Sequence, residues 1–252
     1  NYEHQIFFYG NDLNPILAAL EKNHNLNASK AIPSPKIYPE PETTDKVYFA
    51  NYDMVQTEMN RIAKGEKYNS NLTGTVNVFN SYFGAGLSSI VFQEIRESKS
   101  LAYSARALYG IANDKNLSDY MQVSIGTQAN KLPQAVDAIS ALLSDMPKIE
   151  KQFNNAKESS LKQIASSRII KTNIFFNQMS LKKLGFDYDI RKDTYKNIQN
   201  LTLEATNDFF NKEVKTKKYN TAIIGKKESL DFEALKKLGT IEEVSLEEIF
   251  NY

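Results

Sequence analysis

The chain has 252 residues, 41% apolar and 24% charged, which is the composition of a globular protein with a real hydrophobic core. Its 31 basic and 30 acidic side chains leave a formal charge of +1, so no basic field is available and nucleic acid is not an expected partner. The absence of cysteine excludes disulfides, thiolate metal sites and cysteine nucleophiles. No run approaches the roughly 20 apolar residues of a membrane span, and the first ten residues lack the pattern of a signal peptide. We therefore expect a soluble protein without a membrane span, and composition leaves the cytoplasm and a bacterial cell envelope equally open.

The first 44 residues divide into two parts. An apolar run predicts a buried strand over residues 4–10 that stops at Gly10, and a helix follows through residues 15–20. Residues 31–44 contain four prolines, which exclude a helix and favour an extended linker.

The same order of strand, glycine and helix recurs near the other end of the chain, at residues 221–224, Gly225 and residues 232–238. If a domain of this kind closes in that way, the first segment closes an earlier domain. The resulting division is a tail of an upstream homologous domain (1–30), a Pro-rich linker (31–44) and a complete C-terminal domain (45–252).

The long C-terminal part alternates between strand-like and helix-like patterns. Apolar residues recur with period two where we expect strands and at spacings of three and four where we expect helices. In chain order the patterns predict a strand over 46–64, two helical segments over 72–98 that meet at a glycine turn, a hairpin over 101–127, helices over 133–146, 149–164, 173–185 and 202–214, a strand over 221–224, and a last helix after a capping box formed by Ser245 and Glu248. The fold class is therefore α+β, with an antiparallel sheet and helices layered on one face.

The two histidines of the chain do not form a hydrolytic site. His4 and His24 lie twenty positions apart, and neither begins an H-x-x-E-H or H-E-x-x-H motif that would hold zinc. No histidine follows His24, which also removes a Ser-His-Asp triad from the C-terminal domain. We interpret both histidines as ordinary surface or packing residues, and we expect no metal in this chain.

A glycine-containing run precedes the second helical segment. Gly84, Gly86, Ser88 and Ser89 lie in a turn whose backbone N–H groups can face an anion. The run lacks the lysine of a phosphate loop and the third glycine of a dinucleotide fingerprint. Close packing between two helices, with a hinge at the turn, is therefore the favoured interpretation.

Arg96 and Tyr103 are the candidate binding residues. Arg96 lies near the end of the second helical segment, and Tyr103 follows a short polar turn on the next strand. A guanidinium and a phenol held on rigid elements can hydrogen-bond a peptide carbonyl or a developing oxyanion. In the plainer alternative Arg96 pairs with Glu97 or caps helix carbonyls while Tyr103 packs in the sheet, and the spacing alone favours that alternative.

The stretch YFGAGLSSIVFQEIRESKSLAYS, residues 82–104, resembles a signature of the pitrilysin/insulinase family of zinc metallopeptidases. The signature is a Gly-rich turn, a small-residue pair and F-x-E-[LI]-R-E-x-x-x-L-[AG]-Y. The positions in register are Gly84, Gly86, Ser88, Ser89, Phe92, Glu94, Ile95, Arg96, Glu97, Leu101, Ala102 and Tyr103. Ala85 departs from the pattern, since the family often has a third glycine there.

The resemblance implies a fold, a partner and a cofactor. Members of the family pair an active half, which holds zinc on an H-x-x-E-H motif, with a half that has lost the motif, and this chain matches the second kind. It implies that zinc is bound by a missing catalytic half, that peptides are the substrates, and that Arg96 and Tyr103 reach the substrate backbone. The chain alone is then inactive. An inactive scaffold subunit and a module that binds extended peptides by strand addition remain alternatives.

Overall fold

A computed structural model describes residues 5–24, 33–34, 36 and 38–250. Two compact units are present: the first contains Asn1–Pro39 and Ser167–Asp189, and the second contains Glu40–Ser166 and Ile190–Tyr252. In the described ranges, none of the helices is both long and apolar enough to cross a bilayer.

The second unit is built on a six-stranded sheet with the order β3-β4-β2-β5-β1-β6. Its strands are β1 (Lys46–Asn51), β2 (Gln56–Lys67), β3 (Ser104–Gly110), β4 (Ser118–Gln128), β5 (Asn220–Gly225) and β6 (Thr240–Glu243). The single strand predicted over 46–64 is therefore two strands joined by a short turn, and β6 was not predicted.

The sheet is mixed in direction. The β3-β4-β2-β5 part is antiparallel, as predicted, whereas β1 runs parallel to both β5 and β6. Parallel partners require a crossover, and α8 (Phe232–Lys236) supplies the one between β5 and β6. The alternation of side chains along a strand shows which face is buried but not which way the neighbouring strand runs, so the sequence did not predict these pairings.

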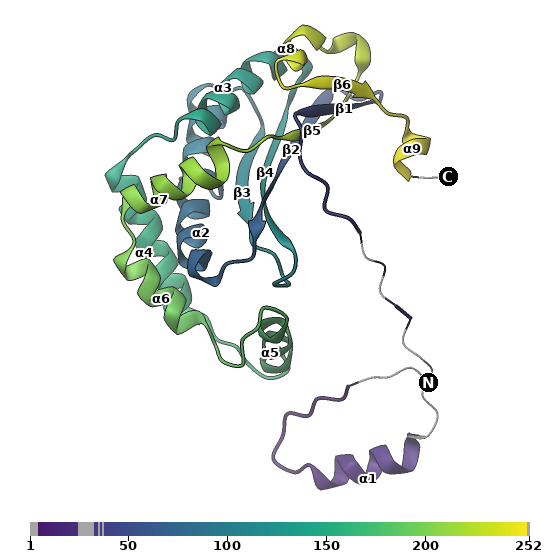
Figure 1. Ribbon diagram of the computed structural model, residues 1–252, viewed down its shortest axis with the longest axis vertical. Coiled ribbons are helices and arrows are strands. Elements are labelled where there is room, and N and C mark those ends of the chain that lie inside the picture. Colours follow the sequence, from purple (N-terminus) through teal and green to yellow (C-terminus); the bar gives the residue numbers. More distant parts are fainter. Residues whose placement is uncertain (1–4, 25–32, 35, 37, 251–252) are drawn as a thin grey trace. The chain divides into compact units, whose positions relative to one another are not determined.

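Most of the helices of this unit cover one face of the sheet (Figure 1). They are α2 (Thr73–Phe79), α3 (Leu132–Ser144), α4 (Glu150–Ser166), α6 (Arg191–Asn200) and α7 (Leu203–Phe210). The α+β class with a helical layer on a sheet is confirmed. Along β2, Met59 and Ala63 point into the core while Glu58, Asn60 and Ile62 alternate with them on the other side. We name that second side, with Ser104 and Arg106 of β3 and Ser124 of β4, the open face.

Aromatic rings join the helical layer to the sheet. Phe79 at the end of α2 stacks on Phe83 at 5.1 Å between ring centroids and meets Phe209 of α7 at 5.2 Å. Phe209 in turn contacts Tyr109 of β3 edge-on at 5.0 Å. Such pairs add to the free energy gained by burial, so α2, α7 and β3 form one packed body.

The predicted pair of helical segments over 72–98 is confirmed. Helix α2 continues into the π-helical turn η2 (Asn80–Gly84), and after a bend the chain resumes as the π-helical turn η3 (Phe92–Ser98). A third π-helical turn, η5 (Asn211–Lys215), extends α7. The 3₁₀ turns are η1 (Ser70–Leu72), η4 (Ala129–Lys131) and η6 (Lys227–Ser229).

The chain's C-terminal elements follow the predicted order. The strand predicted over 221–224 is β5, the helix predicted over 232–238 is α8, and the helix α9 (Leu246–Phe250) follows them. The capping box is confirmed, since the Ser245 N–H donates to Glu248 Oε2 at 2.7 Å and the Glu248 N–H donates to Ser245 Oγ at 3.1 Å. These two bonds satisfy backbone donors that the first turn of a helix leaves free.

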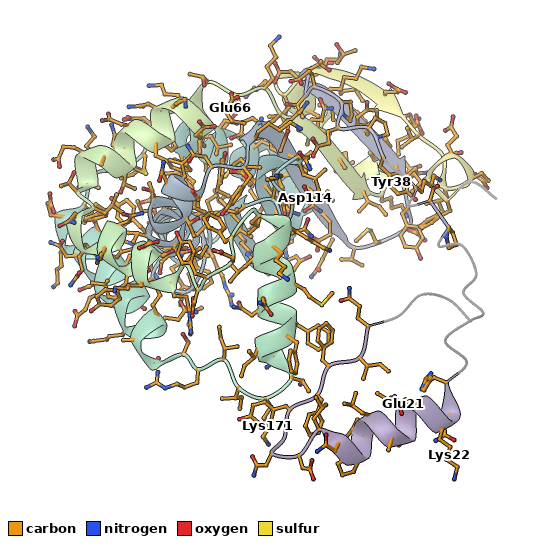
Figure 2. All side chains as sticks on the ribbon, turned by 60° about the horizontal axis from the view of Figure 1, so that its bottom comes forward. Glu21, Lys22, Tyr38, Glu66, Asp114 and Lys171 are labelled. Atoms are coloured by element: carbon orange, nitrogen blue, oxygen red, sulfur yellow. The ribbon has the colours of Figure 1, made fainter. Side chains whose placement is uncertain are left out.

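The first unit contains α1 (Asn14–Asn23) and α5 (Asn173–Lys183), both near their predicted positions. The buried strand predicted over 4–10 is wrong for residues 5–10, and His4 lies outside the described residues. Ile6 and Tyr9 are 49% and 62% exposed, because no strand of the described chain pairs with them. Phe7 stacks on Phe175 of α5 at 4.9 Å instead. Helix α1 buries no residue, and Glu21 and Lys22 extend from its last turn (Figure 2).

Candidate functional site

Tyr103 lies on the open face, immediately before β3. Its N–H donates to the Gly126 carbonyl oxygen at 3.0 Å, and Thr127 Oγ1 donates to the Leu101 carbonyl oxygen at 2.5 Å, so the approach to β3 is fixed to β4 at two points. The ring lies across Gly126, where a Cβ atom would overlap the phenol. The side chain is therefore held on a rigid element, yet the residue remains 41% exposed.

The phenol reaches a carboxylate on a third strand. Tyr103 Oη donates a hydrogen bond to Glu58 Oε1 of β2. Partial burial, together with the hydrogen bond and negative charge of Glu58, raises the pKa of the Tyr103 phenol to about 12. The phenol is therefore protonated at neutral pH and is a hydrogen-bond donor, not a base.

Arg96 lies in η3 with its side chain 45% exposed. Its guanidinium carbon sits 4.9 Å from the ring centroid of Phe92, and its Nε lies 3.7 Å from Glu97 Oε1. The contact with Glu97 is the plainer alternative that the spacing favoured. An exposed ion pair of this kind is worth about 0–1 kcal/mol, so it leaves the guanidinium available to another acceptor.

The structure gives Arg96 and Tyr103 separate partners. No hydrogen bond or ion pair joins the two side chains in the described part of the chain. The turn between them is itself anchored, because Lys131 Nζ donates to the Ser100 carbonyl oxygen at 3.0 Å and the Leu101 N–H donates to the Ile95 carbonyl oxygen at 2.9 Å. Both side chains thus project from fixed backbone.

Sequence reasoning missed Glu58. The signal was present in the alternation of β2, where Thr57 and Met59 point into the core and Glu58 between them must point to the open face. The cross-strand neighbour of Glu58 was not available from the sequence, because the register that places it opposite Gly126 depends on how β2 and β4 pair.

The glycine turn packs against the sheet on one side only. A Cβ atom on Gly84 would overlap the carbonyl oxygen of Ala107 in β3, whereas Gly86 faces open space with φ at +104°. Ser89 is fully buried, and its Oγ donates to the Gly86 carbonyl oxygen at 2.8 Å. Ser88 is exposed and its carbonyl oxygen accepts from Gln152 Nε2. The hinge role of the four residues stays a prediction.

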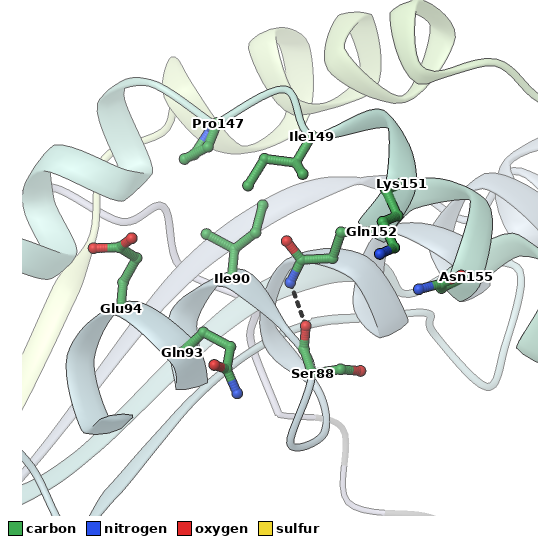
Figure 3. A pocket seen from close by; sticks show the side chains of 9 residues that line it. All are labelled: Ser88, Ile90, Gln93, Glu94, Pro147, Ile149, Lys151, Gln152 and Asn155. Atoms are coloured by element: carbon green, nitrogen blue, oxygen red, sulfur yellow. Dashed lines mark hydrogen bonds between the residues drawn. The ribbon is translucent and has the colours of Figure 1, made fainter. Parts of the chain in front are cut away.

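A groove of about 410 Å³ lies between this turn and the start of α4 (Figure 3). Its walls include Ile90 and Ile149. Two side-chain amides in the wall already donate to backbone carbonyl oxygens: Gln152 to that of Ser88, and Gln93 to that of Leu87 at 2.6 Å. None of the buried, unpartnered side-chain atoms in the described ranges lines it. The groove therefore shows no built site for a ligand.

Metal ligands do not gather in the described residues. No group of three or more His, Cys, Asp or Glu side chains is placed there to hold a metal ion. The described residues therefore offer no group of ligands that fits zinc.

A protein-family model described as the peptidase M16 inactive domain matches residues 5–160. The chain belongs to this family. The resemblance carried by residues 82–104 is thereby confirmed at the level of the family, and the sequence of this chain contains neither H-x-x-E-H nor H-E-x-x-H.

Part of this chain is similar in sequence to a curated zinc protease. An 84-residue segment is 32% identical to the uncharacterized zinc protease YmxG of Bacillus subtilis (strain 168), covering 32% of this chain and 20% of that protein.

Solved structures share the fold. The peptidase M16 inactive domain from Pseudomonas fluorescens matches with a TM-score of 0.59 and 17% identity, over 80% of this chain and 47% of that chain. A protease from Helicobacter pylori matches with a TM-score of 0.64 and 14% identity, over 86% of this chain and 53% of that chain. The M16 domain thus spans about half the length of these solved chains and a smaller part of YmxG.

Proposed function

We propose that this chain is the substrate-binding, non-catalytic half of a zinc metalloendopeptidase that degrades or processes peptides in a closed chamber. Zinc and the catalytic base belong to a partner half, which is a segment of the same protein or a separate subunit. The observation that carries the proposal is the Tyr103 phenol, which is exposed, protonated at neutral pH and fixed across Gly126 on the open face.

The chemistry of the two candidate residues supports this role. A protonated phenol and a guanidinium are donors, and the carbonyl oxygens of an extended peptide are acceptors. When attack on a peptide bond develops negative charge on such an oxygen, fixed donors stabilise it without further reorganisation. Arg96, held over Phe92 but exposed to solvent, is the stronger donor of the two because it is charged.

The proposal includes a division of the chain into domains. Residues 1–30 are the tail of an upstream homologous domain, residues 31–44 are the linker, and residues 45–252 form the C-terminal domain. The carboxylate of Asp45, which accepts from the Tyr219 N–H at 2.9 Å, supports a start of the C-terminal domain near residue 45.

The test uses the full-length parent protein with its catalytic half. Tyr103→Phe and Arg96→Gln are each expected to lower kcat/KM about 10- to 100-fold, because each removes a hydrogen bond to developing charge. Zinc content is expected to stay at the wild-type value. Tyr52→Phe, at an exposed tyrosine after β1, is the control and should leave kcat/KM unchanged.

Three results would count against the proposal. Equal loss of zinc and activity in both variants would assign them to folding or metal retention, and unchanged activity would remove them from the substrate site. A zinc-free native assembly without peptide hydrolysis would favour an inactive scaffold subunit.

One observation favours a second candidate, capture of peptides without cleavage. Strand β6 is one of the two edge strands of the sheet, and Thr240, Glu242 and Glu243 along it are exposed. A free strand edge can add an extended peptide through backbone hydrogen bonds. Peptide affinity measured by calorimetry on the chain without a catalytic half would support this candidate, whereas the leading proposal expects weak binding there.

A further inference from the structure

The side chain of Tyr103 crosses three strands. Its backbone precedes β3, its ring covers Gly126 of β4, and its hydroxyl reaches Glu58 of β2. The register explains why the reach is possible, since Glu58 and Ser104 both pair with Gly126 in a single row across the sheet. Glycine at position 126 is required, because any side chain there would occupy the space of the phenol ring.

Glu58 is well suited to hold that hydroxyl. It lies in the middle of the sheet, between Gly126 of β4 and Ile224 of β5, so its backbone is fixed on both sides. Tyr103 is the side-chain partner found for its carboxylate within the described residues. The charged side chains that share the open face, Lys64 on β2 and Arg106 on β3, form no ion pair with Glu58 there, and Lys64 pairs with Glu42 instead.

We propose that Glu58 is a positioning residue for Tyr103: its carboxylate holds the phenol hydroxyl over the open face until a peptide carbonyl takes over the hydrogen bond. This inference rests on the proposed function, in which Tyr103 contacts the substrate. Without Glu58 the phenol keeps its place over Gly126 but loses the acceptor that fixes its outer end, so fewer conformers present the donor to the peptide.

The first readout is the titration of Tyr103 alone. NMR on the full protein with ¹³Cζ-labelled tyrosine follows the ionisation of each phenol. The Tyr103 signal is the one that disappears in Tyr103→Phe. Partial burial and Glu58 together raise the wild-type pKa to about 12, and Glu58→Gln should lower it part of the way, because the negative charge is removed while the burial remains. Asn60→Ala is the matched control. Asn60 Oδ1 lies on the same face and accepts a hydrogen bond from Ser124 Oγ at 2.5 Å, not from Tyr103. This variant should leave the pKa of Tyr103 unchanged.

The second readout is kcat/KM of the full-length parent protein. Glu58→Ala should lower it about 3- to 10-fold and Glu58→Gln less, because the glutamine oxygen still accepts from the phenol. The double variant Tyr103→Phe, Glu58→Ala should be no worse than Tyr103→Phe alone, since Glu58 acts only through the hydroxyl donor that Tyr103→Phe already removes. A role of Glu58 in folding alone would not produce this dependence on Tyr103.

The outcomes separate the two claims. If Tyr103→Phe lowers activity but Glu58→Ala adds an independent loss, or if Glu58→Gln leaves the phenol titration unmoved, the role of Glu58 is overturned while the proposed function stands. If Tyr103→Phe leaves activity unchanged, the proposed function fails and this role fails with it, whatever the titration shows.

Discussion

Asp119 is a buried carboxylate, and its effect on the stability of the fold depends on pH. It is 2% exposed at the start of β4, and its Oδ1 accepts from the Ala112 N–H at 2.8 Å. Burial raises its pKa, the bond from Ala112 lowers it, and the charge of Glu213 raises it further, with a net upward direction. The folded protein therefore binds this proton more tightly than the unfolded chain, and ionisation at neutral pH destabilises the fold.

We expect Asp119→Asn to stabilise the protein at pH 7, because the amide oxygen keeps the bond from Ala112 without the buried charge. The gain should shrink as pH falls through the raised pKa, where the aspartate becomes neutral as well. Urea unfolding at pH 7 and pH 4 checks this. Asp114→Asn in the exposed turn is the control, with a change within about 0.5 kcal/mol. A gain at pH 4 as large as that at pH 7 would contradict the argument.

Single residues of the site were predictable to different degrees. Arg96 and Tyr103 were proposed from the motif, and Tyr103, expected on the strand that follows the turn, lies immediately before it. Glu58 was not found, since its importance comes from a contact with a residue 45 positions away in the sequence. A strand pattern gives the face on which a side chain lies, but the register that creates this contact is a property of the whole sheet.

At the scale of elements, the close approach of η2 to β3 depends on Gly84. A Cβ atom there would overlap the Ala107 carbonyl oxygen, which is backbone and cannot move aside as a flexible side chain would. Gly84→Ala should therefore lower the free energy of unfolding by about 1–3 kcal/mol. Urea denaturation measures the loss, and Ser88→Ala in the exposed part of the turn should stay within about 0.5 kcal/mol. A wild-type midpoint for Gly84→Ala would refute this packing.

The sequence predicted most elements because their patterns are local. Helices α3 and α4 have apolar residues at spacings of three and four, and the hairpin of β3 and β4 alternates cleanly. Helix α6 and strand β6 were missed, since α6 buries only Thr194 and Ile198 and β6 has four residues, most of them exposed. For Ile6–Tyr9 the sequence predicted a strand that the structure does not have. The composition of this run suits a strand, but composition does not supply a partner strand.

At the scale of the molecule, the mixed sheet with one open face is the feature that gives the chain its proposed role. The helical layer and the aromatic contacts from Phe79 to Tyr109 stabilise the covered face, so the open face can carry polar side chains such as Glu58 and Arg106. The parallel placement of β1 between β5 and β6 could not be predicted from local patterns, because it depends on the crossover through α8.

The central claim is that peptide lies against Tyr103 in the complete protein. A photoreactive benzoylphenylalanine placed at position 103 of the full-length parent, irradiated with a peptide substrate and analysed by mass spectrometry, tests it most directly. The same group at position 52, an exposed tyrosine beyond the end of β1, is the control. We predict a peptide adduct at position 103 and none at position 52. No adduct at 103, or equal adducts at both positions, would contradict the account.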